Sequence, residues 1–347
     1  MKKMTKIITW ALLSIMMQCA VLLFLDKVYF KHSSEFEISE ISTDTSVKDV
    51  SINIPSDAEK IKVSYDGKYV SYFIGDKFYI NDTKNDTSKE IITDEDSNTV
   101  MYAEWLPDRN RVTIAEKIKN DSGQTVVNII SYDAKSGSKY QLKELSKYSS
   151  GMKVEGIATT TLSGVSYVGI NKGGNSSSIY RIDINDDMKN IGVKLNGIAA
   201  LKIFPHKDVL LYEDAGTKKF YYYKNGTSNL INTGTYSNLE LLAVDNKDVV
   251  YMGETSNKKI TKIIYGTLDT DISTWQTLNL EKAKEPNDIN IDENGEILIN
   301  DNLEGTITNM STGSKVSYSG KYITANSKVV MSSDNDQTYI KSLSETE

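Results

Sequence analysis

The sequence predicts an all-β domain over residues 50–347, and three observations indicate a β-propeller. Short runs of alternating apolar and polar residues, rich in Tyr and β-branched side chains, follow one another along this region. Asn, Asp, Gly and Ser interrupt these runs, whereas the whole chain has only 4 prolines, as expected where most segments pair as strands. Finally, a unit of four such runs recurs, which is the pattern of propeller blades.

The recurring unit consists of an apolar strand, a polar turn, a second strand that begins with Val or Ile, and two weaker strands. Successive units are spaced by roughly 40 to 50 residues, the period of a four-stranded blade. The second strands are expected to begin near Val70, Val112, Val165, Val209, Val249, Ile297 and Val329. Seven four-stranded blades are therefore predicted, while six or eight remain alternatives because the third and sixth units are poorly marked.

The final unit supplies only three runs, and residues 47–54 (VKDVSINI) form a spare strand before the first unit. Pairing this strand as the fourth of the last blade would close the ring and remove open sheet edges. The only cysteine is Cys19, so no disulfide within the chain can hold the ring. Strand exchange is the predicted closure.

An apolar segment lies near the N-terminus. Residues 7–25 (IITWALLSIMMQCAVLLFL) are 19 consecutive residues without a charge, which as a helix would measure about 28 Å, close to the ~30 Å of bilayer hydrocarbon. Lysines are denser before the segment than after it, so residues 1–6 are predicted to be a cytoplasmic tail. Residues 7–25 are predicted to be a single-pass transmembrane helix, residues 26–49 a polar stalk, and residues 50–347 an extracytoplasmic domain.

Two other interpretations of the N-terminal segment remain open. A cleaved secretory signal would have a shorter apolar region and a small-x-small exit, which this run lacks. A lipoprotein would be modified at Cys19. However, the preceding residues, Met16, Met17 and Gln18, differ from the Leu-Ala-Gly type of sequence found before a lipidated cysteine.

Composition disfavours some classes of function. The net charge is −7, and the charged and apolar fractions, 25% and 39%, are those of a globular protein. Arginine occurs only at Arg109, Arg111 and Arg181. Because phosphate neutralisation needs clustered cations, no nucleic-acid partner is expected.

Histidine and cysteine chemistry has few candidates. His32 lies in the predicted stalk, and a Ser/His/Asp system would have to use His206, in the turn formed by residues 204–208, as its base. A surface position in that turn is the favoured interpretation of His206. The sequence has 2 histidines and 1 cysteine, which are too few to supply the ligands of a metal site based on these residues. No catalytic, cofactor-binding or metal-ligating residues are therefore assigned, and no cofactor is predicted.

One segment spaces its oxygens like a calcium loop. Residues 290–301 carry Asn290, Asp292 and Asn294 at alternate positions, then Gly295 and a terminal Asp301. The segment departs from the calcium pattern at its first position and at its short final acid. A tight turn between two strands, with Gly295 at positive φ, is favoured instead.

Carboxylates are numerous enough to supply a glycosidase-like pair near the propeller axis. Such a pair would have to project from first strands or connecting loops, and nothing in the sequence singles out two residues. The candidates are Glu104, Asp108, Glu116, Glu155, Asp183 and Glu213.

Two segments resemble the propeller repeats of the TolB and prolyl-oligopeptidase type, including the N-terminal domain of dipeptidyl peptidase IV. These are residues 64–83, with Asp66-Gly67-Lys68-Tyr69-Val70, and residues 103–117, with Trp105-Leu106-Pro107-Asp108. Leu106 replaces the usual Ser and Arg109 the usual Gly, and later units keep only the alternation. The resemblance covers about a quarter of the chain and implies a fold, together with roles in protein binding, peptidase gating or scaffolding. No Gly-x-Ser-x-Gly elbow accompanies it.

These features favour a non-enzymatic binding or scaffold protein of the bacterial cell envelope. The N-terminal segment would hold it at the membrane, and one propeller face would bind an envelope protein or a surface polysaccharide. The alternative is a carbohydrate-active propeller enzyme that uses a carboxylate pair. A sensor is less favoured, since the tail of residues 1–6 is too short for an output domain.

Overall fold

The computed structural model describes residues 2–24, 49–91, 98–185, 187–335 and 337–343. The chain divides into two compact units, Met1–Thr45 and Ser46–Glu347. The first contains the helix α1 (Lys2–Phe24), and the second contains all described strands.

The helix α1 covers most of the segment predicted to cross a membrane. Within the described ranges, no helix meets the combined length and apolarity required of a membrane span. The prediction of a transmembrane helix over residues 7–25 is therefore not supported. Of the predicted stalk, only Asp49 lies within the described residues.

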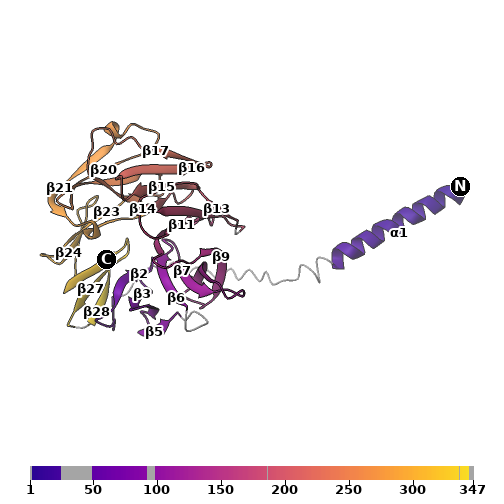
Figure 1. Cartoon of the computed structure of the whole chain (residues 1–347). Helices are drawn as coiled ribbons and strands as arrows, with labels where there is room; N and C mark the ends of the chain where they lie inside the picture. Colours follow the sequence, from indigo (N-terminus) through magenta and orange to yellow (C-terminus); the bar gives the residue numbers. More distant parts are fainter. Residues whose placement is uncertain (1, 25–48, 92–97, 186, 336, 344–347) are drawn as a thin grey trace. The chain divides into compact units, whose positions relative to one another are not determined.

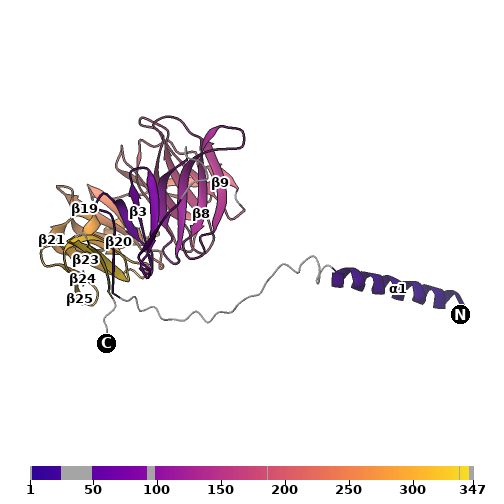
Figure 2. The same ribbon diagram turned by 90° about the horizontal axis from the view of Figure 1, so that it is seen from below.

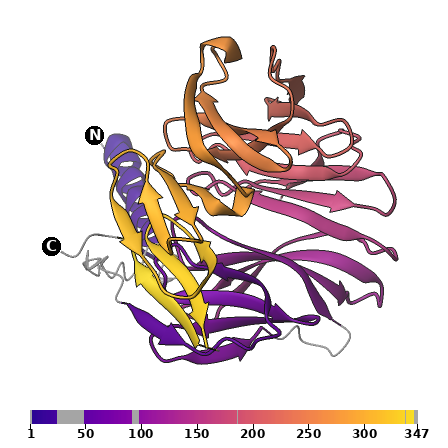
Figure 3. The same ribbon diagram turned by 90° about the vertical axis from the view of Figure 1, so that its left-hand side faces the viewer.

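The second unit is a seven-bladed propeller, as predicted. Its described strands form seven four-stranded antiparallel sheets; six are meanders of consecutive strands, and the seventh combines β26, β27 and β28 with β1. Figures 1 and 3 show the sheets following one another in chain order around a centre, so that the last blade, in yellow, lies beside the first, in purple.

The first four blades have the following strands. Blade 1 contains β2 (Glu59–Val63), β3 (Tyr69–Ile74), β4 (Lys77–Asp82) and β5 (Thr87–Glu90); blade 2 contains β6 (Thr99–Trp105), β7 (Arg111–Lys119), β8 (Thr125–Asp133) and β9 (Lys139–Lys147). Blade 3 contains β10 (Lys153–Thr159), β11 (Ser166–Asn171), β12 (Ser177–Ile182) and β13 (Met188–Asn190); blade 4 contains β14 (Ile198–Ile203), β15 (Val209–Asp214), β16 (Lys219–Lys224) and β17 (Thr227–Leu230). Figure 2 shows β8 and β9 of blade 2, each 9 residues long.

The remaining strands complete the ring. Blade 5 contains β18 (Leu239–Val244), β19 (Val250–Ser256), β20 (Lys259–Gly266) and β21 (Gln276–Lys284); blade 6 contains β22 (Ile289–Ile291), β23 (Ile297–Asp301), β24 (Thr306–Asn309) and β25 (Lys315–Ser317). Blade 7 contains β26 (Lys321–Ala325), β27 (Val329–Asp334), β28 (Gln337–Ser342) and, from the start of the domain, β1 (Val50–Ile52). Short 3₁₀ turns, η2 (Ile272–Thr274) and η3 (Pro286–Asp288), flank β21.

Ring closure occurs by the predicted strand exchange. The strand β1 pairs with β28 in antiparallel register, with Val50 opposite Ile340 and Ile52 opposite Thr338. Ile52 is fully buried in a cluster with side chains of blades 1 and 7. The exchanged strand therefore contributes both hydrogen bonds and packing to the closure.

The second strands begin within one residue of every predicted position. They also carry most of the core, because a strand inside a blade is covered by neighbouring blades on both faces. In β15 all six residues are buried. The sixth unit is faint in the sequence because β22 and β25 are only 3 residues long, and the third because β13 is equally short.

Stacked tyrosines join the second and third strands of three blades. Ring centroids are 5.4 Å apart for Tyr72 and Tyr79, and 5.3 Å apart for Tyr212 and Tyr221. A matching pair in blade 5, Tyr251 with Tyr265, has centroids 5.4 Å apart. Such cross-strand aromatic pairs stabilise the sheet beyond their buried area.

Polar contacts connect neighbouring blades at each of the seven junctions of the ring, mostly through the turns between first and second strands. In ring order these contacts are Asn110 Nδ2 to Asp66 Oδ2 (3.0 Å), Arg109 Nη2 to Thr161 O (3.2 Å), Tyr167 Oη to Asp208 Oδ1 (2.6 Å), Lys207 with Asp248, Asn246 N to Glu293 O (2.8 Å), Asn290 Nδ2 to Ala325 O, and Asn326 Nδ2 to Ser64 O (2.8 Å). Polar contacts thus join every pair of neighbouring blades. The alternation of apolar and polar residues along the strands does not predict these contacts.

Candidate functional site

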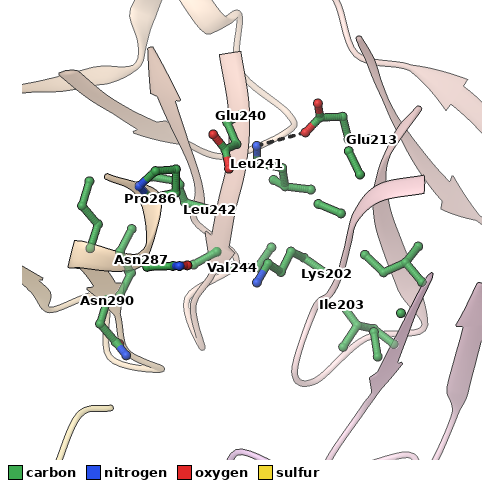
Figure 4. A pocket seen from close by; sticks show the side chains of 18 of the residues that line it. Lys202, Ile203, Glu213, Glu240, Leu241, Leu242, Val244, Pro286, Asn287 and Asn290 are labelled. Atoms are coloured by element: carbon green, nitrogen blue, oxygen red, sulfur yellow. Dashed lines mark hydrogen bonds between the residues drawn. The ribbon is translucent and has the colours of Figure 1, made fainter. Parts of the chain in front are cut away.

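The central channel of the propeller contains a cavity with a volume of about 1470 Å³. Its walls are mainly the first strands of blades 2 to 7, namely β6, β10, β14, β18, β22 and β26. First strands are the innermost of each blade, so a charged residue on one of them faces the channel or an adjacent blade. Figure 4 shows part of this wall.

Glu104 on β6 is held by an ion pair and a hydrogen bond. Its Oε2 atom lies 2.6 Å from Lys62 Nζ and accepts a hydrogen bond of 2.9 Å from Tyr102 Oη. Lys62 also donates to the backbone oxygen of Ala103 at 3.2 Å. Burial, together with the negative charge of Glu104, raises the pKa of Tyr102. This cluster joins blade 1 to blade 2.

Glu155 on β10 accepts three hydrogen bonds. The donors are Asn171 Nδ2 at 3.0 Å, Ser177 Oγ at 2.7 Å and the backbone N–H of Ile198 at 3.0 Å. The last of these comes from β14, so the carboxylate joins blade 3 to blade 4. A carboxylate with this set of donors is occupied in structural contacts.

Glu213 on β15 makes a similar connection between blades 4 and 5. It accepts from the backbone N–H of Leu241 at 3.5 Å and lies 3.5 Å from Lys218 Nζ. Burial raises the pKa of Glu213, and the ammonium of Lys218 opposes this only in part. Figure 4 shows Glu213 beside Glu240 and Leu241 on the channel wall.

Two channel residues differ from these because they make no close polar contact. Lys202 on β14 and Glu240 on β18 are half-buried, and neither side chain has a hydrogen bond or ion pair to any residue that the structure describes. Burial lowers the pKa of Lys202, an effect that Glu104 opposes at longer range. Burial likewise raises the pKa of Glu240, with Lys218 and then Lys202 opposing it.

The other predicted carboxylate candidates do not line the channel. Asp108 pairs with Arg109 at 2.6 Å, and Asp183 pairs with Arg181 at 3.5 Å. Glu116 is buried and accepts from Asn128 Nδ2 at 2.9 Å. The structure therefore brings only Glu104, Glu155 and Glu213 of the six candidates to the channel.

The two histidines fall in different parts of the chain. His206 is exposed on the turn before β15, which confirms the predicted surface position. His32 lies outside the described residues.

The segment with calcium-like spacing is the turn between β22 and β23, which confirms the favoured interpretation. Asp292 Oδ1 accepts from the backbone N–H groups of Asn294 (2.9 Å) and Glu296 (2.7 Å), and Gly295 has a φ of 84°. Asp301 instead pairs with Lys284 at 3.2 Å. No group of three or more His, Cys, Asp or Glu positioned for a metal ion occurs among the described residues.

Sequence reasoning missed the most distinctive channel groups, Lys202 and Glu240. A signal for them was present, because each is a single charged residue within an apolar first strand, in IAALKI and LELLAV. A charged side chain in an apolar strand loses hydration when the strand packs between blades, so such a residue indicates a position that is open to the channel or has a specific partner.

Comparisons with known proteins identify the fold. No family model and no curated protein matches the chain. The chain is similar to a solved chain of a mitotic checkpoint complex, with 12% identity, a TM-score of 0.55, and coverage of 86% of this chain and 95% of that one. It is also similar to the Swd1 β-propeller domain of Myceliophteria thermophila, with 11% identity, a TM-score of 0.50, and coverage of 85% and 100%.

A third similar structure is TolB from Acinetobacter baumannii, with 14% identity and a TM-score of 0.45. The match covers 86% of this chain and 64% of TolB. Similarity at these identities concerns the fold, and the named proteins have varied roles.

Proposed function

We propose that this chain is a non-enzymatic binding or scaffold protein of the bacterial cell envelope, whose propeller presents one face to a partner protein. The observation that carries the proposal is a pair of exposed aliphatic side chains at one end of blade 3. Leu162 is 73% exposed and Ile184 is 71% exposed. The two belong to turns that join β10 to β11 and β12 to β13, which lie at the same end of an antiparallel meander.

The turn that carries Leu162 packs against Ile184. A Cβ atom placed on Gly164, in the turn of Leu162, would lie 3.6 Å from Ile184 Cγ1. Neighbouring exposed aliphatic groups favour association with another apolar surface more than single scattered ones do. Because they sit on turns fixed by a rigid blade, they can be presented to a partner without rearrangement.

The engaged carboxylates of the channel support a non-enzymatic role. Glu104 and Glu155 each hold protein donors that connect adjacent blades, so they stabilise the ring. A general acid or base must be able to reach a substrate proton, and these contacts compete with that role.

The experiment is capture of partners from detergent-solubilised envelope by the tagged, full-length protein. Leu162→Asp and Ile184→Asp are expected to abolish the capture of a specific protein by introducing a charge at the contact. Leu303→Asp is the matched control, because Leu303 is 93% exposed in the turn joining β23 to β24, at the opposite end of its blade. If capture of the partner persists in both blade 3 variants, the proposed binding face on blade 3 is wrong. If only polysaccharide is captured, the proposal of a protein partner is wrong.

We further propose that the N-terminal segment holds the propeller at the membrane, with the propeller outside the cell. The support is the run of 19 uncharged residues in the sequence. In addition, large apolar side chains of α1 are exposed, including Trp10 (71%) and Met17 (73%). Exposed apolar surface of this extent favours burial in lipid or in another protein.

Membrane attachment is tested by fractionation at alkaline pH and by protease treatment of intact cells. The wild-type protein is expected in the membrane pellet, with its propeller accessible from outside. Leu13→Lys, in the middle of the apolar run, should move protein to the soluble fraction. Lys6→Gln, outside the run, serves as the control. Recovery of the wild-type protein in the soluble fraction would count against the tether.

The alternative function is a carbohydrate-active enzyme that uses two carboxylates. The raised pKa of Glu213, caused by burial, is the property that a general acid requires. Hydrolysis of chromogenic glycosides that is lost in Glu213→Gln would favour this alternative over the binding role.

A further inference from the structure

The charged groups of the central channel divide into satisfied and unsatisfied ones. Lys62 with Glu104 and Lys218 with Glu213 form pairs, and Glu155 is satisfied by neutral donors. Of the lining charges that make no side-chain polar contact to the described residues, Lys202 and Glu240 are half-buried, whereas Lys258 and Glu293 are exposed.

The two groups face the same space from neighbouring blades. Lys202 projects from β14 and Glu240 from β18, two first strands that contact one another, and both residues line the channel cavity. Figure 4 shows the Lys202 amino group and the Glu240 carboxylate set apart along the same part of the wall. They form no ion pair, and each feels another opposite charge more strongly at longer range: Glu104 for Lys202, and Lys218 for Glu240.

This arrangement is costly for the free protein. Each group has lost part of its hydration without gaining a counter-charge in contact, so its charged form is disfavoured. Burial correspondingly lowers the pKa of Lys202 and raises the pKa of Glu240. A ligand that supplies the missing contacts would recover this lost stabilisation on binding.

We propose that Lys202 and Glu240 form a binding site for a small zwitterion of the amino-acid type, with the ligand carboxylate on Lys202 and its ammonium group on Glu240. A simple anion would satisfy Lys202 but would be repelled by Glu240 and Glu104. A simple cation would leave Lys202 without a partner. Only a ligand carrying both charges satisfies both groups.

The cavity can admit such a ligand. Its volume of about 1470 Å³ exceeds that of typical small-molecule pockets, roughly 300 to 1,000 Å³. The half-buried Leu242 on β18 also lines it and offers an apolar surface to a methylene chain between the two charges. The site is separate from the partner face on blade 3, so one proposal can fail without the other.

The experiment uses ω-amino acids of increasing length as molecular rulers: glycine, β-alanine, 4-aminobutanoate, 5-aminopentanoate and 6-aminohexanoate. Binding to the purified full-length protein is measured by ligand-detected NMR and calorimetry. We expect saturable binding that passes through a maximum at one chain length. Propionate and ethylammonium, which each carry one of the two charges, should bind about tenfold more weakly or worse.

Lys202→Met and Glu240→Gln should each reduce the affinity of the best ruler by about tenfold or more. The ligand's preference for a particular length should also disappear, which a general effect on folding would not produce. Lys258→Met and Glu293→Gln are the controls, because both residues line the same cavity and should leave affinity unchanged. Circular dichroism establishes that each variant is folded.

Two results would overturn the proposal. One is the absence of binding by every ruler, or binding that Lys202→Met does not weaken. The other is direct pairing of Lys202 with Glu240 in the free protein, seen in heteronuclear NMR as a Lys202 pKa above its usual value, about 10.4. In that case the two groups would satisfy each other and would need no ligand.

Discussion

Asn326 Nδ2 donates a hydrogen bond of 2.8 Å to the backbone oxygen of Ser64, a residue 262 positions earlier in the chain. The same side chain accepts, through Oδ1, from the backbone N–H groups of Lys328 (2.8 Å) and Val329 (2.9 Å). One asparagine thus shapes the first turn of blade 7 and joins that blade to blade 1.

Asn326→Asp should remove the hydrogen bond to Ser64 O and keep the hydrogen bonds within the turn. The carboxylate can still accept from the turn, but it cannot donate to Ser64 O and will instead repel it. We expect a loss of about 1 to 3 kcal/mol in the free energy of unfolding, measured by urea denaturation. Asn232→Asp is the control, since the exposed Asn232 likewise accepts a hydrogen bond from a turn N–H, that of Gly234, at 3.0 Å. Equal losses in the two variants would show that the contact with Ser64 is unimportant.

The exchanged strand should be essential to stability through Ile52. This side chain is fully buried against Val70, Met331 and Ile340. Ile52→Ala should cost about 2 to 5 kcal/mol and increase aggregation, because loosening β1 exposes the edge of β28. Leu230→Ala, at a position that is 56% exposed, should change stability by about 0.5 kcal/mol or less. Thermal unfolding with light scattering measures both effects.

Acid should weaken the junction between blades 1 and 2 through Asp66. Burial would raise the pKa of this carboxyl, but hydrogen bonds from Lys68 and Asn110 outweigh burial and hold the pKa below its usual value. A depressed pKa in the folded state gives stability that is present above the unfolded pKa, about 3.9, and is lost as the pH falls through the folded value.

Asp66→Asn should therefore destabilise the protein at neutral pH by about 1 to 3 kcal/mol, and the difference from wild type should shrink below roughly pH 4. Stability against pH from 2 to 8 is the measurement. Asp76→Asn, in an exposed turn, should leave the curve unchanged. A difference that grows toward low pH would contradict the assignment.

Removing the unsatisfied charge of Lys202 should stabilise the free protein. Lys202→Met keeps much of the side-chain volume and removes a poorly hydrated ammonium, so we expect a gain of about 0.5 to 1 kcal/mol. Because the folded pKa is lowered, the destabilisation is present at neutral pH and fades as the pH rises toward the unfolded pKa, about 10.4.

The gain should accordingly be largest at neutral pH and small near pH 11 in thermal unfolding experiments. Lys258→Met, at an exposed lysine of the same cavity, should have little effect at any pH. A Lys202→Met variant less stable than wild type would mean that the ammonium has a favourable partner in solution.

Gly295 should tolerate no side chain. It has a φ of 84°, and a Cβ there would lie 2.7 Å from Asp245 Oδ2 and would also clash with the Tyr251 hydroxyl, both of blade 5. Gly313 has a φ of 74° but open space around it. Gly313→Ala should therefore cost about 1 kcal/mol from backbone strain, and Gly295→Ala several times more. Similar losses in chemical denaturation would contradict the predicted contact between blades 5 and 6.

Most of the fold could be predicted from the repeat in the sequence. Blade number, second-strand starts and the exchange of residues 47–54 follow from alternation and period, because each blade must bury two faces and every sheet edge must be paired or short. The turn assigned to residues 290–301 was likewise readable, since Asp292 and Gly295 are typical turn residues. The sequence did not show which of the six candidate carboxylates would line the channel. Alternation predicts the face of a strand on which a side chain lies, but it does not predict how far that side chain is from the ring axis.

The sequence by itself determined a closed ring of four-stranded blades, since periodic burial is a local property written into each strand. Only the tertiary structure decided which charges meet across blades: it paired Lys62 with Glu104, and it placed Lys202 and Glu240 in one cavity without a side-chain partner among the described residues. Ring closure brings residues from separate repeats near one another. The distance between two such residues depends on how all the blades pack together, which the sequence of one repeat does not specify.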